Sequence, residues 1–327
     1  MPKQFDRASL VLPRIENAWA RVRMRYCGIC GSDISQYNGR PGRRYPVSLG
    51  HEFVGIVDDV GPDVTNVQIG DVVISDLNYR CGVCLQCRAG RSHLCLEGQS
   101  NRHTNRGFAG FANLDASYLW PIRDGTLHPR LTLVEPLSCV LHALEWAQPR
   151  AQHEVLVVGA GSIGLCMLLA LMNRPNIPSV RFWDINEARI AGIARCAAGS
   201  ISTGPPADHE YDVVFDVSGT PAGLSLACDS VRRGGTLCSM SHLDGQNTEF
   251  LLPKLTRNDV SFKVSYLNGQ VVNLGHAAAI VERQWSTAFD MAISLHDVNL
   301  LPDVFAQRSS SAANKDIIDI APWSSDV

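Results

Sequence analysis

The sequence lacks long apolar runs, a strong charge of either sign and a recognisable export signal. Its 327 residues contain no uncharged stretch near the roughly 18 residues that a membrane-spanning helix needs. The net charge is −3 and the pI is about 6.4, so attraction to nucleic acid or to an anionic membrane is not expected. The first residues, MPKQFDRASLVLP, contain no apolar h-region. These absences predict a cytoplasmic protein without nucleic-acid or membrane partners.

The length predicts two domains, and the pattern of apolar and polar residues changes twice along the chain. Residues 9 to about 145 contain short β-type runs broken by Gly, Pro and Asn. Residues 153 to about 268 alternate apolar strands with amphipathic helices, which is typical of a parallel doubly wound sheet. From about residue 270 the chain is expected to be helical, and it ends in a predicted strand, KDIIDIA. The fold class is therefore α/β.

A glycine-rich turn indicates a dinucleotide site. The motif GAGSIG directly follows the apolar strand EVLVV and opens an apolar helix. Its first glycine permits a tight turn, its second lets the backbone approach a pyrophosphate, and its third lets the helix pack on the strand. The helix N-terminus then offers free N–H groups to the phosphates. The expected cofactor-binding residues are Gly159, Gly161, Ser162, Ile163, Gly164, Asp184 and Arg189.

Asp184 predicts which dinucleotide binds. It ends the next strand, twenty residues after Gly164. A carboxylate there accepts hydrogen bonds from the adenosine ribose hydroxyls and repels a 2′-phosphate, so NAD is favoured over NADP. The alternative is that Asp184 only caps the following helix. The two glycines before Gly164, the spacing and the acid together favour the cofactor role.

The cysteines divide into a cluster and scattered positions. Eleven are present, and four follow the pattern Cys-x2-Cys-x2-Cys-x7-Cys. Four thiolates satisfy a tetrahedral zinc ion and leave no open position, so a structural zinc is predicted. A nucleic-acid-binding zinc module would bring basic flanks, and a redox CxxC would not explain four cysteines. The predicted ligands are Cys81, Cys84, Cys87 and Cys95; core packing is expected for Cys27, Cys139, Cys166, Cys196, Cys228 and Cys238.

Several motifs occur in one order and carry a family resemblance. They are GICGSD (28–33), YPVSLGHEFVGIV (45–57), GDVV (70–73), the cysteine cluster, EPL (135–137) and GAGSIG (159–164). Together they resemble the zinc-containing medium-chain dehydrogenase/reductase family, most closely its sorbitol and threonine dehydrogenase (polyol) branch. The resemblance implies a GroES-like β-rich catalytic domain over residues 1–143 and 270–327. It implies an NAD-binding Rossmann domain over residues 144–269.

The resemblance also implies a catalytic zinc. Cys30 and His51 match zinc ligands, and Glu52 is a ligand or lies at ligand distance. Glu135 of EPL matches the acidic residue that the polyol branch uses directly or through water. Such a mixed shell leaves one position open, where zinc lowers the pKa of an alcohol and holds the alkoxide for hydride transfer to nicotinamide. Ser32 matches the hydroxyl beside the reacting alcohol that begins the proton relay.

Three features depart from the family pattern. Ser35 stands where the family often has the histidine that ends the relay. The N-terminal segment is short and is expected to lack the usual first strand. The stretch RGFAGFANLDASYLW is unusually rich in glycine, and its Phe108 and Phe111 are expected to line the substrate cleft or to pack in the core.

These observations predict an NAD-linked zinc alcohol dehydrogenase with two zinc ions per chain. The expected small-molecule substrate is a secondary alcohol of the polyol, cyclitol or amino alcohol class. The alternatives are a ketone or aldehyde reductase of the same family and a non-catalytic zinc-binding relative. A non-catalytic relative would be expected to have lost ligand positions, and all four are present here. A homodimer or homotetramer is expected.

Overall fold

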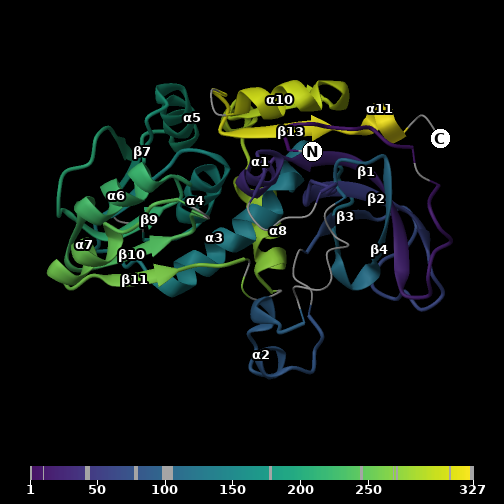
Figure 1. Ribbon diagram of the computed structural model, residues 1–327, viewed down its shortest axis with the longest axis horizontal. Helices are drawn as coiled ribbons and strands as arrows, with labels where there is room; N and C mark the ends of the chain where they lie inside the picture. The colour runs from purple at the N-terminus through teal and green to yellow at the C-terminus, as the bar shows by residue number, and fades with distance from the viewer. Residues whose placement is uncertain are drawn as a thin grey trace.

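The computed structural model describes residues 2–9, 11–40, 45–76, 80–97, 106–176, 179–243, 246–267, 269, 272–308 and 311–324. It contains two sheets joined by long helices (Figure 1). One sheet lies on each side of α3 (Val134–Ala147) and α8 (Val272–Gln284) in that view. None of the described helices is long and apolar enough to span a bilayer.

The first sheet combines strands from both ends of the chain. Its order is β12-β13-β1-β2-β3-β5, and β4 also pairs with β1. The C-terminal β13 runs antiparallel to β1, with Tyr26 opposite Asp319. The chain therefore returns to its first sheet after building the second. The strands are β1 Trp19–Gly28, β2 Glu52–Val60, β3 Val72–Ser75, β4 Phe111–Asp115, β5 Leu119–Pro121, β12 Ile293–Asp297 and β13 Lys315–Asp319.

The second sheet is fully parallel, with the order β11-β10-β9-β6-β7-β8. If β6 to β11 are numbered 1 to 6 and the sheet is read from β8, the order is 3-2-1-4-5-6. This is the doubly wound arrangement of dinucleotide-binding domains. Its central strand β6 is wholly buried. The elements are β6 Val155–Val158, α4 Ser162–Met172, β7 Val180–Trp183, α5 Glu187–Ala197, β8 Ser202–Thr203, β9 Tyr211–Asp216, α6 Pro221–Ser230, β10 Val231–Ser239, α7 Leu251–Arg257 and β11 Ser261–Val264. The predicted α/β class is confirmed.

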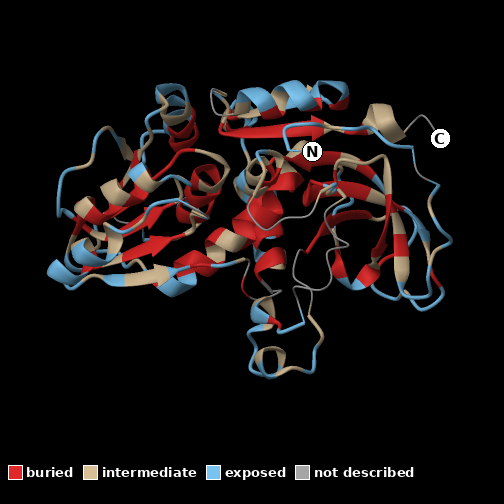
Figure 2. Ribbon diagram, viewed as in Figure 1, coloured by how far each residue is buried: buried red, intermediate tan, exposed pale blue. Residues whose placement is uncertain are grey.

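Helix α3 joins the two halves through one of three core clusters. It packs against α8 and α4, and its buried side chains belong to a cluster that reaches from Val54 in the first sheet to Val157 in the second. Figure 2 shows both sheets and much of α3 buried. Because α3 begins beside the first sheet, its N-terminal residues can contribute to a site between the halves.

The remaining elements are short. The helices are α1 Gly31–Tyr37, α2 Leu85–Arg88, α9 Thr287–Asp290, α10 Leu301–Gln307 and α11 Ala321–Ser324. The 3-10 turns are η1 Ser92–Leu94, η2 Ala116–Tyr118, η3 Pro129–Leu133 and η4 Val298–Leu300. Within residues 2–9 and 11–18 there is no strand, as expected for the short N-terminal segment.

Candidate active site and cofactor site

Three predicted ligands of the catalytic zinc meet at the ends of neighbouring strands. Cys30 precedes α1, directly after β1, and His51 and Glu52 lie at the start of β2. The pairing of β1 with β2 sets Gly28 opposite Glu52, which brings these chain ends together. One ligand atom from each of the three residues lies within 4.8 Å of the others. A thiolate, an imidazole and a carboxylate at this spacing suit a zinc ion.

Asp33 orients His51. Its Oδ1 lies 3.5 Å from His51 Nδ1, and its carboxylate accepts hydrogen bonds from the Gly50 and Cys30 N–H groups, each at 3.1 Å. Burial opposes the charge of Asp33, but His51 and these N–H groups lower its pKa overall. Burial likewise opposes charge on His51, yet Asp33 and Cys30 raise its pKa well above the usual value. Such a carboxylate leaves Nε2 of the imidazole free for a metal.

A buried lysine neutralises Glu52. Lys315, the first residue of β13, donates hydrogen bonds to Glu52 Oε2 and, at 3.3 Å, to the Ile29 carbonyl oxygen. Neither side chain has more than 1% exposure, so each charge depends on its partner. Burial opposes the charge of Lys315, but Glu52 and Cys30 raise its pKa overall. The roles of Asp33 and Lys315 were not predicted from the sequence. Asp33 lies within GICGSD, but its contact with His51 depends on the fold, and Lys315 lies 263 residues from Glu52.

Glu135 approaches the same centre from α3. It lies in the first turn of the helix, outside the set of three, but it interacts electrostatically with His51 and Glu52. Burial raises its pKa to about 7. Its Oε1 lies 3.6 Å from the Cys139 thiol, one helical turn later. The expectation that Cys139 is a core residue is therefore wrong, because α3 turns it toward Glu135. The other five scattered cysteines are buried, as predicted.

The glycine-rich turn connects β6 to α4. Gly159 has φ +116°, and a Cβ there would lie 2.8 Å from the Val217 backbone. A Cβ on Gly164 would lie 2.3 Å from the Gly159 carbonyl oxygen, so this glycine permits close packing of helix on strand. A Cβ on Gly161 would meet nothing within 4 Å, which leaves its backbone open to a ligand. This geometry is the one that a pyrophosphate requires.

Asp184 lies beside this turn. Its Oδ2 accepts a hydrogen bond of 2.7 Å from the Ala160 N–H, and its Oδ1 accepts one of 2.8 Å from the Asn186 N–H. The carboxylate is thus fixed between the glycine-rich turn and the start of α5. That is where the ribose of a bound dinucleotide would lie in this fold.

The four-cysteine cluster forms a lobe around α2 that projects from the body (Figure 1). The four sulfurs lie within 4.8 Å of one another, and Sγ of Cys84 is 4.0 Å from that of Cys95. Four sulfurs bound to one zinc at about 2.3 Å would be about 3.8 Å apart. Backbone N–H groups of Cys87 and Leu96 lower the pKa of the Cys84 thiol to about 6, which favours a thiolate. The four donors fit a closed zinc site.

Comparison with known proteins agrees with this geometry. Residues 16–124 match the alcohol dehydrogenase GroES-like domain. The chain is 35% identical to D-altritol 5-dehydrogenase of Agrobacterium fabrum (strain C58 / ATCC 33970) over 70% of each chain. It is 30% identical to D-arabinitol dehydrogenase 1 of Uromyces fabae over 72% of this chain and 71% of the relative. The chain belongs to the zinc-containing medium-chain dehydrogenase/reductase family.

The membership makes this chain an oxidoreductase of the polyol branch. A crystal structure of a candidate zinc-binding dehydrogenase from Sinorhizobium meliloti 1021, bound to NADP, superposes with a TM-score of 0.79. It is 25% identical, and the match covers 95% of this chain and 94% of that one. The predicted combination of a GroES-like catalytic part with a Rossmann part is thereby confirmed.

Two of the departures from the family pattern lie on α1 and in the stretch that leads into β4. Ser32 and Ser35 are both half-buried on α1, one turn apart. Phe108 packs with the core of the first sheet, and its ring lies edge-on to that of Phe305 at 5.7 Å. Phe111 is in β4, opposite Arg23. Packing is thus the observed role of Phe108.

Arg189 has partners in the C-terminal part of the chain. Its Nε donates to the Ser311 carbonyl oxygen at 3.0 Å, and its Nη2 donates to the Arg308 carbonyl oxygen at 3.1 Å. The guanidinium therefore holds the loop before β13. Its predicted contact with a cofactor stays a prediction.

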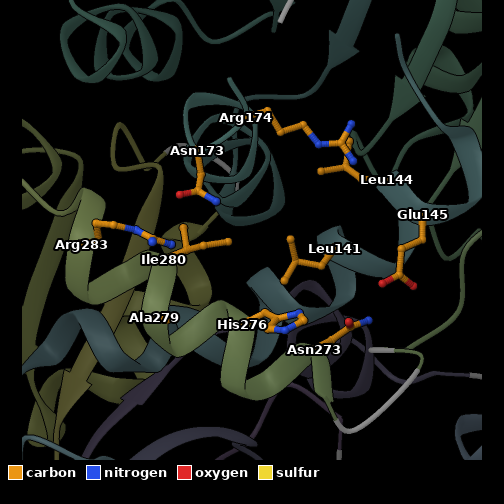
Figure 3. A pocket seen from close by; sticks show the side chains of 10 residues that line it. All are labelled: Leu141, Leu144, Glu145, Asn173, Arg174, Asn273, His276, Ala279, Ile280 and Arg283. Atoms are coloured by element: carbon orange, nitrogen blue, oxygen red, sulfur yellow. The ribbon is translucent and has the colours of Figure 1, made fainter. Parts of the chain in front are cut away.

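Two cavities among the described residues lie away from these ligands. One cavity, of about 300 Å³, lies among α3, α4 and α8 and is lined by the side chains drawn in Figure 3. Its α3 residue Glu145 lies ten residues from Glu135, about 15 Å along the helix. The other, of about 380 Å³, includes Glu154, Ser179 and Glu210 at the amino ends of strands in the parallel sheet. Ligands of such sheets bind at the carboxyl ends, so neither cavity belongs to the proposed chemistry.

Proposed function

We propose that this dehydrogenase transfers a hydride between NAD and a secondary alcohol of the polyol, cyclitol or amino alcohol class. The observation that carries the proposal is the mixed ligand set of half-buried Cys30 with buried His51 and Glu52, approached by buried Glu135 from α3. The names of the D-altritol and D-arabinitol dehydrogenases support a polyol. We further propose two zinc ions per chain, to be tested by metal analysis of freshly purified protein.

The chain's own residues would prepare the alcohol. Cys30 and His51 would hold the catalytic zinc, with Glu52 as a ligand or at ligand distance and Glu135 acting directly or through water. When bound, zinc lowers the pKa of the alcohol and stabilises the alkoxide. Asp33 fixes the imidazole of His51 through the contact at 3.5 Å. Ser32 would relay the alcohol proton, taking it up while its own hydroxyl proton passes to water.

A substrate panel tests this proposal most directly. Sugar alcohols, cyclitols, amino alcohols and simple secondary alcohols would each be incubated with NAD and with NADP, and nicotinamide reduction followed by absorbance. The proposal expects polyhydroxylated or amino secondary alcohols to give the highest kcat/KM. A preference for simple alcohols would contradict the substrate class. The second candidate function, reduction of the matching ketone or aldehyde, uses the same site and would be measured with NADH.

NAD is the proposed cofactor because Asp184 presents a fixed carboxylate beside the glycine-rich turn. Replacing Asp184 with Ser should narrow the preference for NAD over NADP, since the charge that repels a 2′-phosphate is removed. The crystal structure of the relative with NADP makes this measurement necessary. A wild-type preference for NADP would overturn the assignment.

The proposed proton path begins at Ser32 and lacks a histidine at position 35. Ser35 cannot act as a base near neutral pH, so water would carry the proton onward. Ser32→Ala should therefore reduce kcat much more than Ser35→Ala. Ser35→His should add an ionisation near pH 6.5 to the kcat profile. Equal losses in the two alanine variants would overturn this path.

Three expectations remain proposals about organisation. We propose that residues 1–143 and 270–327 form the catalytic domain and that 144–269 form the cofactor domain. Cytoplasmic localisation is consistent with eleven free cysteines. A homodimer or homotetramer is consistent with the edge strand β11, where Val264 is 57% exposed. Light scattering of the purified protein would test the last expectation.

A further inference from the structure

The loop before β13 reaches into the cofactor half of the molecule through one side chain. Asn314 is only 1% exposed, and its Nδ2 donates hydrogen bonds to the Ala160 carbonyl oxygen at 2.5 Å and to the Arg189 carbonyl oxygen at 2.9 Å. Ala160 lies inside the glycine-rich turn, and Arg189 lies in α5. One amide therefore ties the turn to the helix that follows the next strand.

A glycine in α5 makes room for this amide. A Cβ on Gly192 would lie 2.1 Å from Asn314 Oδ1 and 3.2 Å from its Cγ. Glycine is unfavourable in a helix interior, so its presence there needs a packing reason. Close approach of Asn314 supplies that reason. Asn314 supplies the amide, and Gly192 supplies the space in which the amide fits.

The loop that carries Asn314 is itself fixed. Arg308 forms an ion pair of 2.8 Å with Asp316, and both side chains are mostly buried. The Ser311 carbonyl oxygen accepts hydrogen bonds from Arg189 Nε at 3.0 Å and from Asn186 Nδ2 at 3.2 Å. Several bonds across the two halves therefore hold Asn314 in register, and its position does not depend on a single contact.

The next residue touches the metal-ligand set. Lys315 donates a hydrogen bond to Glu52, whereas Asn314 donates to Ala160 of the glycine-rich turn. Two adjacent residues thus contact the two sites whose ligands must meet for hydride transfer. A displacement of the glycine-rich turn would move Asn314. Because Lys315 is the next residue, the same movement would reach the ion pair of Lys315 with Glu52.

We propose that Asn314 is a positioning residue that holds the glycine-rich turn in its cofactor-binding shape and, through Lys315, couples cofactor occupancy to the metal-ligand set. The inference rests on the proposed binding of a nicotinamide dinucleotide at this turn. It assigns no chemical step to Asn314. The partner it serves is the dinucleotide, by orienting the backbone that receives the pyrophosphate.

Asn314→Ala and Gly192→Ala test the contact from opposite sides. Each should weaken NADH binding by about 10- to 100-fold, the effect of losing one or two buried hydrogen bonds. The double variant should be no weaker than the worse single variant, because both changes break one contact. Ala312→Ser is the matched control: this exposed position lies two residues before Asn314 and removes none of the contacts named above, so the variant should bind NADH within about twofold of wild type. Binding would be measured by NADH and NADPH fluorescence titration.

A cobalt-substituted enzyme tests the coupling without turnover. In the wild type, adding NADH should shift the visible cobalt absorption, and the shift should be lost or reduced in Asn314→Ala at saturating NADH. An unchanged shift, or NADH affinities within twofold of wild type in both variants, would overturn the inference. If the wild type binds NADPH only, the NAD preference is wrong, and weaker NADPH binding in both variants would still support the inference. If it binds neither dinucleotide, both proposals fail.

Discussion

The two metal-ligand sets of this dehydrogenase are built in opposite ways. The four cysteines come from fifteen consecutive residues on a projecting lobe, and three of them are half-exposed. The other set draws Cys30, His51, Glu52 and Glu135 from the ends of β1 and β2 and from α3. His51, Glu52 and Glu135 are each at most 6% exposed. Proximity in sequence makes the first set, and strand pairing makes the second.

The difference extends to how each charge is stabilised. In the lobe, backbone N–H groups stabilise sulfur: the Cys84 N–H donates to Cys81 Sγ at 3.3 Å. In the buried set, side chains from distant segments do this work, with Asp33 on His51 and Lys315 on Glu52. A closed all-thiolate shell suits a structural ion, whereas a buried mixed shell suits chemistry. Substitutions at four positions test this division.

The largest effect on activity is expected in the buried set. His51→Ala should lower kcat/KM by about 1000-fold or more, because loss of the catalytic metal removes several kcal/mol of transition-state stabilisation. Metal analysis should then find one zinc fewer, with the lobe still loaded. A variant that keeps activity within tenfold would contradict the assignment.

Loss of a lobe ligand should act on stability instead. Cys95→Ser removes the buried thiol of the lobe and should lower the Tm by about 5–10 °C, since structural zinc contributes folding energy. Activity per folded molecule should fall by less than about tenfold. The lobe contacts α3 through the ring of His93, whose centroid lies 4.8 Å from that of His142. His142 lies seven residues after Glu135, so this contact is separate from the catalytic ligands. A loss as large as that of His51→Ala would erase the division between the sets.

The pH dependence of the metal-free protein should isolate Glu135. Its pKa in the folded state is raised to about 7, above the unfolded value near 4.5. The folded state therefore binds the proton more tightly, and this contribution to stability is full below about pH 4.5 and lost as pH rises through 7. Glu135→Gln should remove a change on the order of 2–3 kcal/mol from the pH dependence of unfolding. Urea titrations at pH 5 and pH 8 would measure it.

The affinity of the buried ligand set for zinc should change with pH in the opposite direction to the stability of the metal-free protein. Glu135 must lose its proton to become a ligand, so zinc affinity should rise as pH rises through 7. In Glu135→Gln this rise should be smaller, while zinc binding by the lobe should stay unchanged. An unchanged pH dependence of both stability and zinc affinity would rule out the proposed state of Glu135.

The smallest effect is expected at Cys139. Its thiol is a weak hydrogen-bond donor to Glu135 Oε1 at 3.6 Å. Cys139→Ala should lower kcat by roughly two- to fivefold, and Cys139→Ser should restore most of it because the hydroxyl also donates. If Ala and Ser behave alike, Cys139 only fills space beside Glu135.

Much of both sites was readable from the sequence because their ligands lie in ordered motifs. The spacing of Cys81, Cys84, Cys87 and Cys95 predicted one cluster, and the structure brings the four together. The glycine-rich turn was predicted from its position between an apolar strand and a helix, which β6 and α4 confirm. Both features depend on local geometry, which adjacent residues encode.

The functional neighbours of the ligands could not be read in this way. The role of Asp33 depends on the return of His51 at the start of β2, and Cys139 was assigned to the core until α3 was placed beside the ligand set. Lys315 lies 263 residues from Glu52 in the chain, and no spacing rule links them. A motif gives the identity of a ligand and not the partner that orients it.

The α/β class, the family and the residue types that can bind zinc and a dinucleotide follow from the order of the amino acids alone. Which charges compensate one another follows from the way in which the chain folds. The pairing of β13 with β1 brings Lys315 to Glu52, and the loop before it brings Asn314 to the glycine-rich turn. The physical reason is that buried charges and amides need partners at hydrogen-bond distance, and such partners come from whichever segment the fold places there.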